Sequence, residues 1–240
     1  MKLTVRGAVA AIFILAMCAL CVRLGFWQLD RLEQRRARNA AIRAATAQPP
    51  LVLGSAALTG DPRALEWRRA EAAGRYHHAG DLVVRGRSRQ GRPGVHLVSP
   101  LVLADGRVVM VNRGWVPSPD GNTADVRALR TRGPVRVRGV LLPMEARPDS
   151  GLPLGGRGGA DTTWRRVDLA AARERSPGPL IPLYLQQLPE DDASEAPPVP
   201  EPLPELSEGN HLSYAVQWFS FALIGLTGLA ILVLRGRKTA

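Results

Sequence analysis

The chain has 240 residues, and its 32 lysines and arginines against 21 aspartates and glutamates give it a formal charge of +11. Such a basic balance is typical of nucleic-acid-binding proteins. Long apolar runs near both ends predict a membrane protein instead, so we expect no nucleic-acid partner. Anionic membrane lipid, acidic protein surfaces and the carboxylates of a bound cofactor are the favoured partners of the basic side chains. Between the two runs lie roughly 180 residues, enough for one domain with its own core.

The first apolar run, at residues 7–22, follows two basic residues and is prolonged by a second apolar segment at 24–29. A cleaved signal peptide is the alternative, but the run lacks a clean Ala-x-Ala cleavage site. We therefore expect a membrane helix at 7–29, with residues 1–6 in the cytoplasm. Because the next stretch lacks glycine and proline, the helix should continue to about residue 47.

The second apolar run, at residues 214–234, contains no charged side chain. At about 1.5 Å per residue it is roughly 31 Å long, which matches the hydrocarbon core of a bilayer. We expect a membrane helix at 211–234 and a basic cytoplasmic tail at 235–240. Acidic residues before this helix and basic residues after it place both termini in the cytoplasm under the positive-inside rule. Arginines between residues 31 and 43 oppose this orientation, although long translocated domains largely escape the rule.

Residues 50–189 should fold as an extracytoplasmic β domain, because short β-rich runs bounded by Gly, Pro or Asp replace helical periodicity there. The expected strands are 67–76, 81–87, 94–103, 107–115, 134–142, 163–169 and 183–188. Asp105-Gly106 between two of them predicts a tight hairpin turn with a positive φ. The predicted fold class is a membrane protein of the α+β type, in which two terminal transmembrane helices flank one mainly antiparallel β barrel or sandwich.

Two stretches are expected to lack regular structure. Residues 151–159 are glycine-rich and should form a flexible loop, because no flanking strand and helix or Lys-Ser/Thr signal supports a phosphate-binding site. Residues 190–209 are acidic and proline-rich, which predicts an extended tether between the β domain and the second helix.

The sequence offers little sign of catalysis, and we expect no enzyme, because it contains no hydrolase, metalloprotease or P-loop signature. Cys18 and Cys21 have the spacing of a redox or copper site, but an apolar helix favours two small buried side chains. His77 and His78 could bind copper, yet neighbours on a strand point to opposite faces, which favours a polar strand end. His96 is expected to be a hydrogen-bonded residue of the domain.

His211, Tyr214 and Trp218 form the most suggestive cluster, because positions i, i+3 and i+7 share one face of a helix. A neutral imidazole beside aromatic rings at a membrane surface can ligate haem iron. The alternative is a turn histidine followed by two ordinary interfacial aromatics. The residues alone favour this second interpretation.

Several longer motifs follow the order found in one known family. They are Leu24-Gly25-Phe26-Trp27-Gln28-Leu29-Asp30-Arg31, Gly74-Arg75-Tyr76, the later Arg85, Gly91 and Gly94, Pro100-Leu101, Val111-Asn112-Arg113-Gly114-Trp115-Val116-Pro117, and Asn210-His211-Leu212-x-Tyr214-Ala215-x-x-Trp218. With these motifs the chain resembles the surfeit locus protein 1 family of cytochrome c oxidase assembly factors over nearly its whole length.

The resemblance implies a multi-pass protein of the bacterial cytoplasmic (inner) membrane, with its central domain on the extracytoplasmic side. It also implies an assembly factor for haem–copper cytochrome c oxidase that binds haem a transiently and assists its insertion into subunit I. A haem-free membrane scaffold that stabilises an assembly intermediate is the alternative. Subunit I is the implied partner, with haem a synthase as a second candidate.

The same resemblance makes His211 the candidate axial ligand of the haem iron, with Tyr214 and Trp218 packing on the porphyrin. Arg113 is a candidate partner for the haem propionates, because a guanidinium can pair with a carboxylate through two hydrogen bonds. A structural role for Arg113 in its hairpin fits the sequence equally well.

Overall fold

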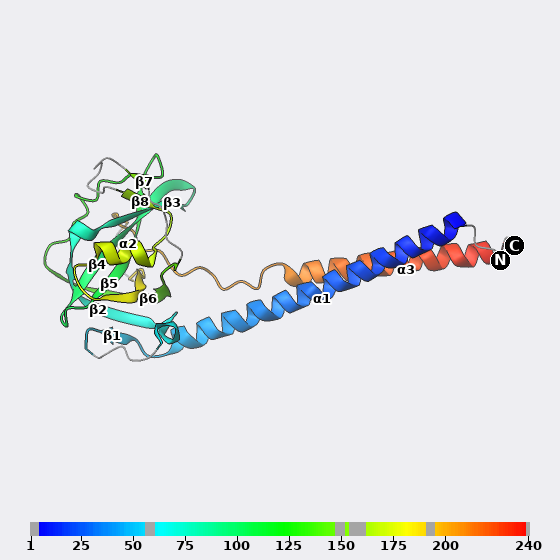
Figure 1. The fold of residues 1–240 in the computed structure, drawn as a ribbon, viewed down its shortest axis with the longest axis horizontal. Coiled ribbons are helices and arrows are strands. Elements are labelled where there is room, and N and C mark those ends of the chain that lie inside the picture. Colours follow the sequence, from blue (N-terminus) through cyan, green and yellow to red (C-terminus); the bar gives the residue numbers. More distant parts are fainter. Residues whose placement is uncertain (1–4, 56–60, 147–151, 154–161, 191–194, 239–240) are drawn as a thin grey trace. The chain divides into compact units, whose positions relative to one another are not determined.

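The computed structural model describes residues 5–55, 61–146, 152–153, 162–190 and 195–238, and it separates into two compact units. One unit combines residues 1–41 with 205–240, and the other spans 42–204. The first unit is a pair of long helices and the second is a β domain (Figure 1).

The helix pair consists of α1 (Val5–Ala47) and α3 (His211–Lys238), which lie side by side (Figure 1). As predicted, α1 continues without a break to Ala47. Phe26 of α1 packs edge-on against Phe219 of α3, with ring centroids 5.3 Å apart. Side-chain packing therefore joins two helices that lie at opposite ends of the sequence.

Cys18 and Cys21 are free and buried in a small cluster with Ala222 of α3. They occupy the helix interface as small apolar residues, which is the interpretation that the sequence favours. Beyond the apolar part of the pair, Arg36 of α1 forms an ion pair with Glu208 at 2.9 Å, just before α3 begins.

Both helices expose large apolar side chains over much of their length. Ile12 of α1 is 67% exposed, and Ile224 of α3 is 68% exposed. By length and composition, Gly7–Ala47 and His211–Arg235 could each cross a membrane. The two apolar helices predicted at the chain ends are therefore present, and their exposed surfaces resemble those of membrane spans more than those of soluble core helices.

In the β domain, the described residues form one sheet of nine strands in the order β1-β2-β6-β9-β5-β4-β3-β8-β7. The strands are β1 (Leu51–Leu53), β2 (Arg69–Tyr76), β3 (Leu82–Arg89), β4 (Arg92–Leu103), β5 (Val108–Pro117), β6 (Pro134–Pro143), β7 (Leu152–Pro153), β8 (Thr162–Trp164) and β9 (Leu180–Gln187). An additional pairing of β2 with β4 closes β2, β6, β9, β5 and β4 into a small barrel. The predicted barrel-like β domain is thus confirmed. It also contains parallel pairs, such as β5 with β9.

Alternation along the strands fills the barrel with apolar side chains. The buried residues of this interior cluster are Leu53, Ala70, Ala72, Leu101, Leu103, Val109, Val111, Val137, Leu141, Ile181, Leu183 and Leu185. Successive strand residues point to opposite faces, so residues 96 and 98 of β4, 110 and 112 of β5, and 184 and 186 of β9 project from the outer face.

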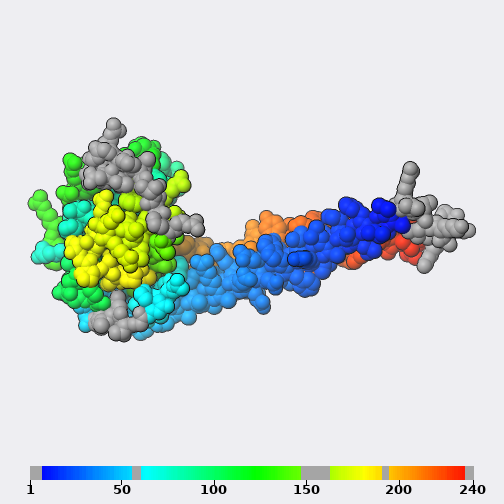
Figure 2. Space-filling model, in the orientation of Figure 1, coloured from blue at the N-terminus to red at the C-terminus, as the bar shows by residue number. Residues whose placement is uncertain are grey.

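The outer face is apolar at one end and polar at the other. At the apolar end, Val84, Val98 and Met110 pack with Ala172 of α2 (Leu169–Arg175). Figure 2 shows this helix and its neighbours, coloured yellow, at the surface of the domain. The polar end carries Asn112, which pairs in register with Val98 on one side and with Gln186 on the other.

The tight turn predicted at Asp105-Gly106 joins β4 to β5. Gly106 has a φ of 82°, and its N–H donates to the carbonyl oxygen of Leu103 at 3.1 Å. Asp105 Oδ1 accepts the backbone N–H of Arg107 at 3.0 Å. The positive φ expected for this glycine is therefore confirmed.

The strand predicted at 163–169 is shorter than expected. β8 ends at Trp164, and Asp168 caps α2 by accepting a hydrogen bond from the N–H of Ala171 at 2.8 Å. The cap satisfies an N–H of the first helical turn. The start of α2 therefore ends the strand earlier than the β-rich residues predicted. The other predicted strands are present within a few residues of their expected bounds.

The short strands β1 and β7 were not predicted, because two or three residues give no measurable periodicity. β7 lies inside the stretch 151–159 that was expected to be a loop. The rest of that stretch, residues 151 and 154–159, lies outside the described residues.

Residues 195–204, predicted as part of a free tether, lie against the β domain. Val199 is buried and exchanges two backbone hydrogen bonds with Trp115 of β5, each 2.8 Å long. Glu195 forms an ion pair with Arg89 at 3.1 Å. The segment is extended as expected, but it docks because the edge of β5 has unpaired backbone groups at this position.

Candidate ligand sites

His211 is the first residue of α3, and its ring contacts the other helix. Its Nδ1 lies 2.8 Å from Gln28 Oε1 of α1. An amide oxygen can only accept, so Nδ1 carries the proton and donates it to Gln28. The lone pair of the neutral ring is then on Nε2, which is the atom left to bind a metal.

Tyr214 and Trp218 follow His211 on α3 but have different surroundings. Tyr214 is about half exposed. Trp218 packs against the cluster of Cys18, Cys21 and Ala222, and its ring stands edge-on to Phe221 with centroids 6.0 Å apart. Tyr214 is therefore available to a ligand, whereas much of Trp218 is already used to join the two helices.

Arg113 belongs to the β domain, where it lies on β5 and is buried. Its Nη2 donates to Leu129 O at 2.8 Å and to Thr131 Oγ1 at 3.0 Å. Its guanidinium lies 4.8 Å from the centre of the Tyr76 ring, and burial raises the pKa of Tyr76 to about 12. These contacts fit the structural alternative for Arg113, because they hold the loop that carries Leu129 and Thr131 against β2 and β5.

The histidine pair at 77–78 directly follows the last residue of β2, Tyr76. His77 is exposed, whereas His78 places Nδ1 3.1 Å from Asp81 Oδ2 and Nε2 3.0 Å from Thr131 O. Both ring nitrogens of His78 are thus engaged within the domain. In the part of the chain that the structure describes, no group of three or more His, Cys, Asp or Glu side chains could hold a metal ion.

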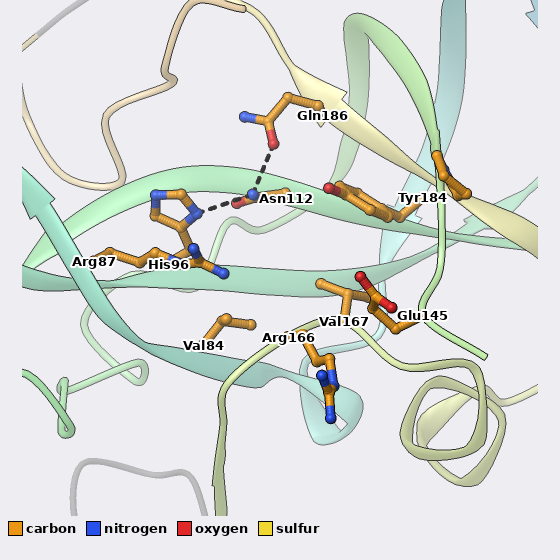
Figure 3. Close-up of a pocket in the computed structure, with 10 residues that line it drawn as sticks. Val84, Arg87, His96, Asn112, Glu145, Arg166, Val167, Tyr184 and Gln186 are labelled. Atoms are coloured by element: carbon orange, nitrogen blue, oxygen red, sulfur yellow. Dashed lines mark hydrogen bonds between the residues drawn. The ribbon is translucent and has the colours of Figure 1, made fainter. Parts of the chain in front are cut away.

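A polar pocket on the outer face of the barrel was missed by the sequence analysis. It has a volume of about 210 Å³ and is lined by Val84, Arg87, His96, Asn112, Pro143, Glu145, Arg166, Val167, Tyr184 and Gln186. Figure 3 shows Arg87 and His96 on one side of this pocket and Tyr184 and Glu145 on the other. The available signal was Asn112, a polar residue directly after the apolar run 108–111.

One side of the pocket is a chain of hydrogen-bonded side chains. Asn112 Nδ2 lies 3.1 Å from His96 Nδ1 and 2.8 Å from Gln186 Oε1 (Figure 3). Because this amide nitrogen donates to both, His96 Nδ1 must be the acceptor and Nε2 must carry the ring proton. Asn112 Oδ1 also accepts the backbone N–H of Gly114 at 3.2 Å.

Burial controls the protonation of the titratable side chains at this side of the pocket. Burial, together with the charge of Arg87, lowers the pKa of His96 to about 4, so the ring is neutral at physiological pH. His96 Nε2 lies 2.8 Å from Glu201 Oε2 but has no hydrogen-bond partner among the described residues. Burial also raises the pKa of Glu201. His96 is thus a hydrogen-bonded residue of the domain, as expected.

Comparison with known proteins identifies a family for most of the chain. A family model described as the SURF1 family matches residues 15–223. The chain belongs to the SURF1 family. Membership of this family suggests a role in the assembly of cytochrome c oxidase.

Individual SURF1 relatives have similar lengths and low identity. A SURF1-like protein of Monosiga brevicollis is 27% identical over 219 residues, which cover 85% of this chain and 79% of the relative. A SURF1-like protein of Rickettsia felis is 24% identical over 214 residues, which cover 88% and 90%. The surfeit locus protein 1 of Takifugu rubripes is 28% identical over 153 residues, which cover 56% and 62%.

The motifs that carry the SURF1 resemblance make specific contacts in both units. In the helix pair, Gln28 of the first motif contacts His211 of the last. In the β domain, Asn112 organises the polar chain, and Trp115 pairs with Val199. Gln28 and Asn112 therefore position side chains at the two candidate sites, whereas Trp115 holds the segment around Val199.

Proposed function

We propose that this SURF1-family protein assists assembly of haem–copper cytochrome c oxidase by binding haem a transiently at His211 before haem enters subunit I. The hydrogen bond from His211 Nδ1 to Gln28 Oε1 carries this proposal. Metal-ligating histidines usually donate their other ring N–H to an oxygen acceptor, which fixes the tautomer and the ring orientation. Gln28 does this for His211, and Nε2 retains its lone pair.

The surroundings of His211 fit a large apolar ligand. Phe26 and Trp27 precede Gln28 on α1 and are 58% and 52% exposed. Tyr214, one turn after His211, is about half exposed. Exposed aromatic rings near a neutral imidazole supply apolar area for a porphyrin as well as a nitrogen for its iron.

We also propose that both helices span the bacterial cytoplasmic membrane, with the termini in the cytoplasm and the β domain outside. The exposed apolar side chains of α1 and α3 and the basic residues after Leu234 support this topology. Reporter fusions after Thr123 and after Lys238 should report opposite sides of the membrane. Two fusions on the same side would contradict the topology without affecting the haem proposal.

A haem titration of the purified full-length protein in detergent tests His211 directly. The wild-type protein should bind haem a and shift its absorption spectrum, and His211→Ala should abolish or strongly change that shift. His77→Ala is the matched control, because it removes an exposed histidine from the β domain. A wild-type spectrum in His211→Ala would show that His211 is not the ligand.

Variants of neighbouring residues separate ligation from packing. Gln28→Leu removes the acceptor of the Nδ1 proton and should weaken haem binding, while Gln28→Glu, which keeps an acceptor, should retain it. Tyr214→Phe keeps the ring and should weaken haem binding only slightly. Trp218→Ala removes stacking area and should weaken haem binding to an intermediate extent.

A haem-free scaffold for an assembly intermediate is the second candidate function. The packing of Trp218 between the helices favours it, because this ring serves the protein's own structure. Under the haem proposal, cells lacking the protein should contain oxidase subunit I deficient in haem. Normal haem content together with reduced oxidase abundance would instead support the scaffold.

A further inference from the structure

We propose that the polar pocket of the β domain binds a small organic monocarboxylate between Arg87 and Arg166. This proposal concerns the 42–204 unit alone and does not depend on haem binding at His211. It rests on unpartnered guanidinium groups, on the balance of charge in the lining and on the apolar walls of the pocket.

Two arginine N–H groups in the pocket lack acceptors. The Nε atoms of Arg87 and Arg166 are both buried, and neither has a hydrogen-bond partner in the described part of the chain. Arg87 is held in place by its Nη2, which donates to Arg165 O at 3.2 Å. A buried donor without an acceptor costs free energy, so a small rotation of either guanidinium that brings its Nε to an acceptor oxygen of a ligand would be stabilised.

The pocket lining has a net positive charge that a single bound negative charge would neutralise. The lining contains two guanidinium groups, Arg87 and Arg166, and one carboxylate, Glu145, while His96 is neutral. Within the described residues, neither arginine forms an ion pair within 4.0 Å. Glu201 lies beside His96, outside the lining, and it interacts with Arg89 as well as with Arg87. One bound monoanion would balance the net positive charge of the lining, through charge-assisted hydrogen bonds that are stronger than neutral ones.

The remaining walls and the volume limit the rest of the ligand. Val84, Pro143 and Val167 supply apolar surface, and the Tyr184 ring closes the side opposite His96 (Figure 3). A volume of about 210 Å³ is below the roughly 300–1,000 Å³ of drug-sized sites. The ligand should therefore combine a carboxylate with a short apolar group.

The polar side of the pocket is fixed before any ligand binds. Asn112 uses both amide hydrogens on His96 and Gln186, so the three side chains hold one another. A preorganised site loses less conformational entropy on binding. These residues shape the pocket, while Arg87 and Arg166 line it with guanidinium groups that form no ion pair among the described residues.

Isothermal titration of the full-length protein in detergent with propionate tests the proposal, with propionamide as a neutral molecule of the same shape. We expect saturable propionate binding and no binding of propionamide. Arg87→Gln and Arg166→Gln should each weaken propionate binding at least tenfold. Arg136→Gln is the matched control, because Arg136 is an exposed strand arginine outside the pocket. The affinity of this variant for propionate should equal that of the wild type.

Three results would overturn the proposal. They are equal binding of propionate and propionamide, unchanged affinity in both pocket variants, and binding of inorganic phosphate as tightly as propionate, since phosphate lacks the apolar group. Thermal unfolding of each variant checks that it is folded. If Arg87→Gln unfolds, Arg87→Lys, which keeps the charge but loses Nε, serves in its place and should also weaken binding.

Discussion

Gly25 of α1 lies directly against the ring of Phe219 of α3. A β-carbon built at position 25 would be 2.6 Å from that ring, which is closer than any real contact. Small residues allow apolar helices to approach closely. The pair of helices that brings Gln28 to His211 therefore depends on the absence of a side chain three residues earlier.

Replacement of Gly25 by Ile should separate the helices. Cys18 and Cys21, the only cysteines of the chain, are buried at the helix interface and serve as native reporters. Their labelling by a maleimide in detergent should become several times faster in Gly25→Ile. Gly228→Ile is the control, because a β-carbon there meets nothing within 4 Å. Equal labelling rates in the two variants would contradict the close approach.

Replacement of Gly106 by Val should destabilise the β domain through backbone strain alone. The φ of 82° is unfavourable for a β-branched residue, while a β-carbon at this position would meet no atom within 4 Å. The free energy of unfolding should fall by about 1 kcal/mol or more. Chemical denaturation measures the change. Gly106→Asn should lower the free energy of unfolding by less, because asparagine tolerates a positive φ.

Replacement of Gly114 by Ala should release the segment around Val199. A β-carbon at Gly114 would be 2.1 Å from Val199 O, and its φ of 119° already disfavours a side chain. Both effects oppose the backbone pairing between Val199 and Trp115. Limited proteolysis should then cut residues 195–204 faster than in the wild type, while cleavage elsewhere in the β domain stays slow. Unchanged protection of this segment would argue against the docking.

The stability of the β domain should fall in mild acid because of His96. Its pKa is lowered to about 4 in the folded state, against about 6.5 in an unfolded chain. Between these values the unfolded state binds more protons, so the free energy of unfolding should decrease as the pH falls from about 6.5 to about 4, by up to roughly 3 kcal/mol.

Denaturation of His96→Gln over the same pH range isolates this contribution. The variant cannot titrate at position 96, so its stability should fall less steeply. Burial raises the pKa of Glu201, so protonation of this carboxylate should increase the stability as the pH falls. Glu201 is present in both proteins, so the difference between the variant and the wild type reports His96 alone. Parallel pH profiles for the two proteins would show that His96 does not cause the loss of stability in mild acid.

The sequence by itself determined the features that depend on neighbouring residues. Unbroken apolar runs predict α1 and α3, because a helix of sufficient length needs only local hydrogen bonds and an apolar surface. Alternating β-rich runs predict most strands, and Asp105-Gly106 predicts its turn, because glycine alone adopts a positive φ at little cost. The order of the motifs indicated the SURF1 family.

Only the tertiary structure decided which distant side chains meet. Gln28 and His211 are 183 positions apart, and no local pattern reveals that one fixes the tautomer of the other. The docking of Val199 on Trp115 and the gathering of Arg87, Asn112 and Arg166 around one pocket likewise depend on strand register and barrel closure. Register and closure result from packing of the whole domain, so these contacts exist only once the chain has folded.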